Sequence, residues 1–123
     1  MRPQTLIAVS DVEKSSAWYC EVLGATSGHG GPDYERLVVD GVLVMQLHQL
    51  EVEHHHGRFG DRAHPLGNGV AIWFETDGLE AAAEQARALG ATVQTEIHYN
   101  PNADHHEIWL RDPDDYLVVL ASV

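Results

Sequence analysis

Histidine is the residue type through which this sequence could most readily do chemistry. Nine of the 123 residues are histidine, and imidazole both binds transition metals and titrates near neutral pH. Six of them are candidates for a metal site: His48, His54-His55-His56 and His105-His106. They could bind zinc or nickel, or they could be solvated loop residues, since three consecutive rings cannot all face one ion.

Two tryptophans and two carboxylates alternate in apolar stretches of the second half. Trp73 precedes Glu75 by two residues, and Glu107 precedes Trp109 by two. An indole can stack on a planar ligand, or it can be a core residue facing a helix, which is the interpretation we prefer for Trp73. A buried carboxylate needs a partner, and beside an indole it suits a cationic or polar aromatic ligand. The nearest candidate partners are Arg36, Arg111 and His106.

The elements that position these side chains follow from an internal repeat. An offset of 66 residues superimposes Asp11 on Asp77 and the tetrapeptide Leu-Gly-Ala-Thr at 23–26 on the same tetrapeptide at 89–92. Each Asp stands where a helix N-cap is expected, and Gly24 and Gly90 stand where a left-handed C-cap belongs. The pattern predicts helices over 13–22 and 79–89.

The remaining apolar stretches have the length and composition of strands. Asp40-Gly41 lies between two of them and predicts a two-residue hairpin, and the turn at 111–115 contains Pro113. The predicted strands are 6–9, 25–29, 34–39, 42–48, 70–74, 92–97, 107–110 and 116–120. The fold class is therefore α+β, with two tandem βαβββ modules.

We expect one domain over residues 1–123, with module one at about 1–50 and module two at about 68–123. The stretch from about 49 to 67 links them and shows no usable hydrophobic period. Long structureless loops are uncommon in compact domains and tend to be functional or mobile. This loop contains the run His54-His55-His56.

The charge balance limits the classes of partner. Lys and Arg number 7 and Asp and Glu 19, for a net charge of −12, so nucleic acid and anionic membranes are disfavoured. No apolar run approaches the roughly 20 residues that span a bilayer. Cys20 is the single cysteine and no signal-peptide pattern is present, so we expect a cytoplasmic protein.

The chain resembles the vicinal-oxygen-chelate superfamily, the glyoxalase, bleomycin-resistance and dioxygenase proteins. The motifs that carry the resemblance are Gln4–Asp11, Trp18–Gly24, Gly69–Glu75, Asp77–Gly90 and His106–Asp114. It implies a strongly curved mixed sheet forming a half-open cup, and a homodimer with a shared ligand cavity. The superfamily includes metal-dependent lyases, isomerases and extradiol dioxygenases as well as metal-free drug-binding proteins, so fold alone does not fix function.

The resemblance also implies four metal-ligand positions, from the first and last strands of each module. They fall on Gln4, on Gln46 (or His48 in a register shifted by two), on Val70 and on Val119. Valine has no lone pair to donate, so we predict no metal at these positions and no cofactor. A relocated site that binds zinc or nickel through the histidines is the fallback.

We therefore predict a small-molecule-binding protein of the resistance type, which sequesters a bulky aromatic or cationic antibiotic or metabolite. The alternative is a metal-dependent enzyme, a glyoxalase-like lyase, isomerase or dioxygenase that uses Gln4, Gln46 and His48. Strand alternation places Gln46 and His48 on one face, with His48 near the rim of the cup or in water. The segment 99–107 is an ordinary turn or a loop over the cavity. The candidate ligand-binding residues are Gln46, His48, His55, Trp73, Asn100, Asn102, His105, Glu107 and Trp109.

Overall fold

The computed structural model describes residues 1–53 and 57–123. The candidate His55 and the rest of the run 54–56 lie outside the described residues. The chain divides into two compact units, Met1–Leu66 (unit 1) and Gly67–Val123 (unit 2). Each unit is a βαβββ module with one helix and one four-stranded mixed sheet, so the predicted α+β fold and its duplication are confirmed.

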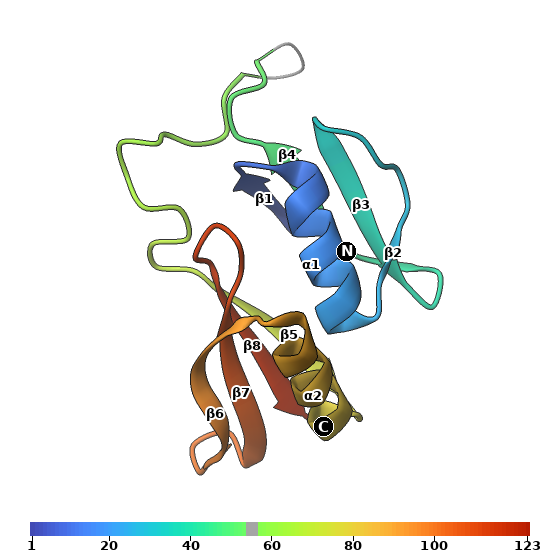
Figure 1. The fold of residues 1–123 in the computed structure, drawn as a ribbon, viewed down its shortest axis with the longest axis vertical. Coiled ribbons are helices and arrows are strands. Elements are labelled where there is room, and N and C mark those ends of the chain that lie inside the picture. Colours follow the sequence, from blue (N-terminus) through green and yellow to red (C-terminus); the bar gives the residue numbers. More distant parts are fainter. Residues whose placement is uncertain (54–56) are drawn as a thin grey trace. The chain divides into compact units, whose positions relative to one another are not determined.

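Unit 1 begins with a short strand and a helix that Figure 1 shows in blue. Its sheet has the order β1-β4-β3-β2, with β1 parallel to β4 and the other pairs antiparallel. The helix packs on β3 and β4. Its elements are β1 (Leu6–Val9), α1 (Val12–Leu23), β2 (Thr26–Ser27), β3 (Tyr34–Val39) and β4 (Val42–Gln49).

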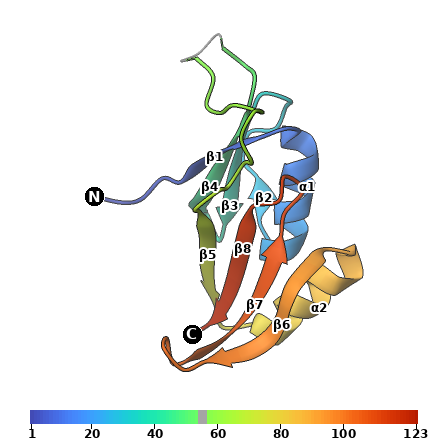
Figure 2. The ribbon, with the colours of Figure 1, turned by 90° about the vertical axis from the view of Figure 1, so that its left-hand side faces the viewer.

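Unit 2 repeats this topology, with the sheet order β5-β8-β7-β6 and β5 parallel to β8. Its helix packs on β8 and β6 and covers one side of the sheet (Figure 2). Its elements are β5 (Ala71–Thr76), α2 (Leu79–Leu89), β6 (Thr92–Asn100), β7 (His105–Arg111) and β8 (Leu117–Ser122). Among the described residues, no helix has the length and apolar content that a membrane span requires.

The turns follow the sequence chemistry, but one hairpin is longer than predicted. Asp40 and Gly41 both have positive φ, 49° and 77°, as a two-residue hairpin requires. The predicted strands ended at 97 and resumed at 107. The structure instead extends β6 to Asn100 and starts β7 at His105, and these two residues are paired across the hairpin. The segment predicted to be a loop is therefore mostly sheet.

The two helices begin differently, although the repeat predicted an Asp cap for both. Asp11 is the N-cap of α1, and its carboxylate accepts a hydrogen bond from the Lys14 N–H at 3.0 Å. The N-cap of α2 is Gly78, which provides no side-chain cap. The prediction for Asp77 was wrong because α2 starts one residue later than the repeat implies. Gly78 N–H itself donates to the Thr76 hydroxyl at 3.0 Å.

A buried carboxylate, Glu35 on β3, ties unit 1 together. Only 2% of it is exposed. It accepts hydrogen bonds from the hydroxyls of Ser16 on α1 and Ser27 on β2, at 2.9 and 2.7 Å. Backbone N–H groups also donate to it, those of His29, Gly30 and Arg36. Burial acts to raise the pKa of Glu35, but these hydrogen bonds outweigh it and lower the pKa from 4.5 to about 2.

Asp11 and Asp77 occupy equivalent positions of the repeat, but only Asp11 caps a helix, so the two residues allow a matched test. We expect Asp11→Ala to lower the free energy of unfolding by about 1 kcal/mol, because an orphan helix N–H loses its acceptor. Asp77→Ala removes no cap and should change it by about 0.5 kcal/mol or less. Urea unfolding of the two variants measures the difference, and equal losses would contradict the assignment of the caps.

The lowered pKa of Glu35 predicts that the free energy of unfolding decreases at acid pH. Its folded pKa is depressed to about 2 from 4.5, so its contribution is complete above about pH 4.5 and is lost as the pH falls through 2. That shift corresponds to about 3 kcal/mol. We expect Glu35→Gln to be less stable than the parent at pH 7 and the gap to narrow towards pH 2. A gap that stays constant in unfolding curves from pH 7 to 2 would contradict this.

Candidate functional site

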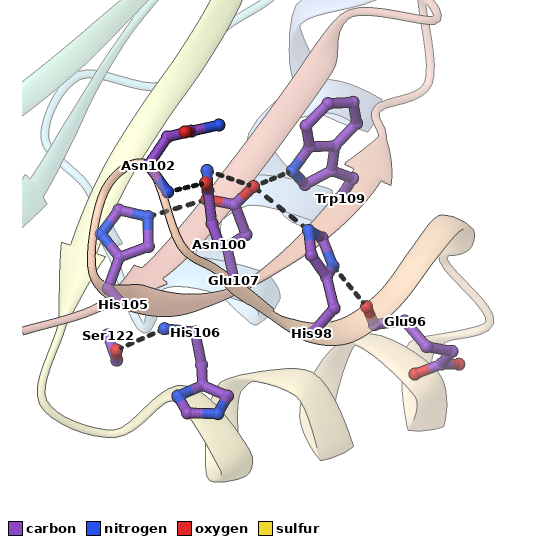
Figure 3. Close-up of polar contacts among 9 residues, drawn as sticks. All are labelled: Glu96, His98, Asn100, Asn102, His105, His106, Glu107, Trp109 and Ser122. Atoms are coloured by element: carbon purple, nitrogen blue, oxygen red, sulfur yellow. Dashed lines mark hydrogen bonds and ion pairs between the residues drawn. The ribbon is translucent and has the colours of Figure 1, made fainter.

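The polar residues of unit 2 gather on the face of its sheet that points away from α2, here called the site face. Strand register places Trp73, Val119 and Trp109 side by side on this face. The next row contains Glu107 and His98. Figure 3 shows the side chains of Glu107, Trp109 and His98 on this side of the sheet. The side chain of His106, the residue before Glu107, is directed towards α2.

Glu107 is the centre of the site face. Its side chain is 1% exposed, and donors surround both of its oxygens (Figure 3). Trp109 Nε1 donates to Oε1 at 2.8 Å, and the ring nitrogen Nε2 of His105 lies 2.7 Å from Oε2. The Asn100 amide donates to both oxygens at 3.3 and 3.2 Å. Nε2 of His98 lies 3.3 Å from Oε1.

These contacts determine the charge state of Glu107. Burial acts to raise its pKa, but the hydrogen bonds from His105, Trp109 and Asn100 outweigh it, and the pKa is lowered below the ordinary value of 4.5. The positive charge that His98 can carry acts in the same direction. Glu107 is therefore an ionised carboxylate at neutral pH, contacted by the side chains of His98, Asn100, His105 and Trp109.

The two histidines that contact Glu107 differ in their surroundings. Nδ1 of His98 lies 2.9 Å from the backbone oxygen of Glu96, so both of its ring nitrogens face acceptors. The His105 ring instead lies beside Trp73, with 5.7 Å between the ring centroids and a tilt of 45°. The side chain of His105 is 16% exposed, and Trp73 is 47% exposed. Only His105 therefore connects the buried carboxylate to an exposed aromatic surface among these residues.

The β6–β7 turn orders the edge of the site. The Asn100 side-chain oxygen accepts a hydrogen bond from the Asn102 N–H at 3.0 Å, so the amide group of Asn100 is directed at Glu107. Asp104 has a φ of 55°, and its carboxylate accepts a hydrogen bond from the Tyr99 hydroxyl at 2.6 Å. Strand pairing places Asn100 opposite His105, and the contact with Asn102 orients the Asn100 amide.

The structure brings four predicted residues, Asn100, His105, Glu107 and Trp109, into one network and places Trp73 beside it. Asn102 takes part through its main chain, and its side chain is exposed. Trp73 was predicted to be a core residue on the helix side; it lies on the opposite face because it pairs with Val119 and not with a helix-facing residue. His98 was not predicted. The predicted strand ended at residue 97, one residue short of His98. The structure extends β6 beyond that point, and the extension pairs His98 with Glu107.

Two of the three partners predicted for the carboxylates, Arg111 and His106, were wrong for Glu107. Arg111 donates to Gln94 and to the backbone oxygen of Asp115. His106 points to the other side of the sheet, because neighbouring strand residues alternate. Arg36 belongs to unit 1, and its pairing with Glu107 stays a prediction.

Gln46 and His48 share one face of the unit 1 sheet, as predicted, with Met45 and Leu47 on the other. The amide oxygen of Gln46 accepts a hydrogen bond from the Tyr34 hydroxyl. The alternative that His48 is a strand-end residue in water was wrong, because it is 2% exposed. Its Nδ1 lies 2.8 Å from the backbone oxygen of Gln49, and its ring contacts Phe59 with 4.8 Å between centroids.

A surface cavity of about 600 Å³ lies elsewhere in unit 2, at the N-terminal end of α2. Exposed Asp77, Glu80 and His106 line it, together with Leu79, and it contains no buried polar side chain. It does not include Glu107 or its partners. We place the candidate site at Glu107 because a buried, ionised and fully hydrogen-bonded carboxylate is the more specific feature.

Comparison with known proteins agrees with this architecture. No curated protein matches the chain. An integron cassette protein from the mobile metagenome of V. cholerae has a TM-score of 0.74 at 21% identity, over 99% of this chain and 95% of the other. A lactoylglutathione lyase from Agrobacterium tumefaciens has a TM-score of 0.73 at 17% identity, over 99% and 92%. TioX from Micromonospora sp. ML1 has a TM-score of 0.74 at 12% identity, over 98% of each chain.

These likenesses concern the fold. The family itself is given by the sequence, because residues 2–120 match one family model. The chain belongs to the glyoxalase/bleomycin resistance protein/dioxygenase superfamily.

Proposed function

We propose that this protein binds and sequesters a small molecule on the site face of unit 2, in the manner of a resistance protein. The ligand is a bulky aromatic or cationic antibiotic or metabolite. The observation that carries this proposal is the position of Trp73, whose indole is 47% exposed and lies beside a histidine held by a buried carboxylate. Aromatic surface next to a few oriented polar groups is typical of ligand sites.

The polar side chains of the site support binding because they are held in one conformation before a ligand binds. Burying an ionised carboxylate costs free energy that its partners must offset, and such a group adds little to stability by itself. Here Glu107 holds the rings of His105 and Trp109 in place by hydrogen bonds of 2.7 and 2.8 Å. A ligand that meets side chains already held in one conformation loses less entropy on binding.

The charge of the chain supports the same ligand class. A net charge of −12 attracts cations, leaves neutral aromatic molecules unaffected and repels anions. On β5, Glu75 is exposed two residues from Trp73. A cationic aromatic ligand over the Trp73 indole would gain from both the ring and the neighbouring carboxylate.

The chain's donors do not fit the metal that the superfamily implies. Val119 is a fully buried aliphatic residue of β8, and Val70 is another aliphatic residue, just before β5. The amide oxygen of Gln46 is engaged by Tyr34. Among the described residues, no group of three His, Cys, Asp or Glu side chains is arranged to hold a metal ion. The geometry therefore favours the binding protein over a metal-dependent enzyme.

We also propose a homodimer, as the resemblance to small members of the superfamily implies. The single cysteine, Cys20, supports a location in the cytoplasm. Light scattering on the purified protein at several concentrations tests the assembly. A mass of one chain, 13.6 kDa, at every concentration would contradict it.

The site predicts that Trp73 governs affinity. A library of planar aromatic compounds, screened by thermal shift, should contain ligands that raise the melting temperature. For the best of these, we expect Trp73→Ala to weaken binding about tenfold or more in calorimetric titrations, which corresponds to at least about 1.4 kcal/mol. The free energy of unfolding should change by about 1 kcal/mol or less, since Trp73 is half-exposed.

Tyr99 offers a matched control for Trp73. It is 50% exposed, but it pairs with His106 on the other face of the sheet. Tyr99→Ala should leave the affinity unchanged within about twofold. Equal losses in the two variants would show that the ligand does not occupy the site face.

Binding should not require a metal. We expect protein purified without a nickel column to contain far less than one metal ion per chain by elemental analysis. Its affinity for the same ligand should be unchanged after treatment with a chelator, because the site residues recognise the ligand directly. Zinc, nickel or iron near one per chain, together with lost binding after chelation, would favour the metal-dependent enzyme.

A further inference from the structure

We propose that His105 and Glu107 form a proton-accepting pair, which takes the proton from a weakly acidic O–H or N–H group of a planar ligand held against Trp73. The inference rests on the proposed function for the place of the ligand. It goes further by naming a chemical step and by narrowing the ligand class to phenols and N–H heteroaromatic compounds.

The hydrogen bond between the two residues determines which nitrogen of His105 is available. An ionised carboxylate has no proton to donate, so the 2.7 Å contact between His105 Nε2 and Glu107 Oε2 requires a proton on Nε2. In the neutral ring the lone pair then resides on Nδ1. The lowered pKa of Glu107 agrees with its role as the acceptor.

The orientation of His105 directs this lone pair away from the network. Figure 3 shows one ring nitrogen of His105 on the Glu107 contact and the other on the opposite side of the ring. The ring is partly exposed, and its centroid lies 5.7 Å from that of Trp73. A flat ligand that covers the exposed indole therefore reaches the edge of the imidazole.

His98 contacts the same carboxylate but cannot do the same chemistry. Its Nε2 lies 3.3 Å from Glu107, and its Nδ1 lies 2.9 Å from the Glu96 backbone oxygen. Because each of its ring nitrogens faces an acceptor within the protein, neither nitrogen is directed at a ligand. We assign His98 the role of a positioning residue that keeps the Glu107 carboxylate in place.

The charged groups around His105 are three carboxylates and His98. Glu107 contacts its ring directly, and Asp104 precedes it in the turn. Glu75 on β5 lies in the same row of the sheet as Glu107, across Ala121. These carboxylates are the negative charges near the imidazolium that the transfer creates. Among the described residues of this row, His98 is the one other group that can carry a positive charge.

The proton transfer is balanced within the pair and the ligand. The O–H or N–H bond of the ligand breaks, and a new N–H bond forms at His105 Nδ1. The electron pair stays on the ligand atom, and Glu107 remains a carboxylate beside the new imidazolium. A neutral ligand reaches the acidic protein without repulsion, and it becomes an anion only where the imidazolium faces it.

The protein alone tests the first half of this inference. In nitrogen-15 NMR spectra of the imidazole rings above the titration range, His105 should show its proton on Nε2 and a lone pair on Nδ1. The assignment comes from the spectrum of His105→Gln, in which the signals disappear. A proton on Nδ1 would overturn the proposal, whatever the protein binds.

The second half is tested with 4-nitrophenol and 4-nitroanisole, which share a flat ring but differ in the acidic proton. On binding, 4-nitrophenol should show the visible absorbance of its anion at a lower pH than in water, with its pKa reduced by about one unit, a tenfold change in acidity. This shift should vanish in His105→Gln and shrink in Glu107→Gln. Binding of 4-nitroanisole should persist in both variants.

His106→Gln is the matched control, because His106 is the adjacent histidine on the opposite face. It should retain the full absorbance shift. If 4-nitroanisole binds but 4-nitrophenol stays protonated, the binding site stands and the proton-accepting pair is overturned. If neither compound binds, both this inference and the site on which it rests are overturned.

Discussion

The organisation of unit 2 depends on one requirement, that a buried negative charge must have donors at both of its oxygens. Glu107 is 1% exposed, and the free energy of an unpaired carboxylate at such a position would be prohibitive. Its donors come from two strands, with Asn100 and His98 on β6 and His105 and Trp109 on β7. Satisfying the charge therefore fixes the register of the hairpin, and it explains why sheet structure extends into a segment with the composition of a turn.

The two units meet the same requirement with different chemistry. Glu35 in unit 1 is satisfied by serine hydroxyls and backbone N–H groups, and its partner Ser16 belongs to α1, so this carboxylate faces the helix. Glu107 faces away from its helix, and its donors are two imidazoles, an indole and an amide. The hydroxyl donors of Glu35 connect β3 to α1 and β2 within unit 1. Imidazole and indole rings continue to the surface, where they can contact a ligand.

The sequence predicts the scaffold well because its signals are local. Helix 79–89, strand 34–39 and the Asp40-Gly41 turn follow from periodicity and turn chemistry, and the structure has the same bounds for all three. The site is predicted only in part. Glu107 and Trp109 can be linked by alternation within one strand. His98 could be linked to them only through pairing with another strand, which depends on a hairpin register that no local pattern contains.

Failures at single positions have the same origin. Asp77 matches Asp11 in the repeat, yet α2 begins one residue later and leaves Asp77 outside the cap position. Trp73 has the size and apolar character of a core residue, and either face of β5 could have buried it. The face of the sheet on which Trp73 lies follows from its pairing with Val119, which in turn pairs with Trp109 on β7. Propensity and hydrophobicity do not distinguish the two faces of a strand that is apolar on both.

The register of β7 also decides which histidine can do chemistry. A shift of one residue would exchange His105 for His106 on the site face, and it would turn Glu107 towards α2. The metal-ligand positions that the resemblance implies for unit 2 fall on Val70, just before β5, and on Val119 of β8. The polar groups of unit 2 lie instead on the adjacent pair, β6 and β7. A duplicated scaffold with aliphatic residues at the metal positions can thus still organise a reactive group, provided that a buried carboxylate replaces the ion as the centre around which side chains are ordered.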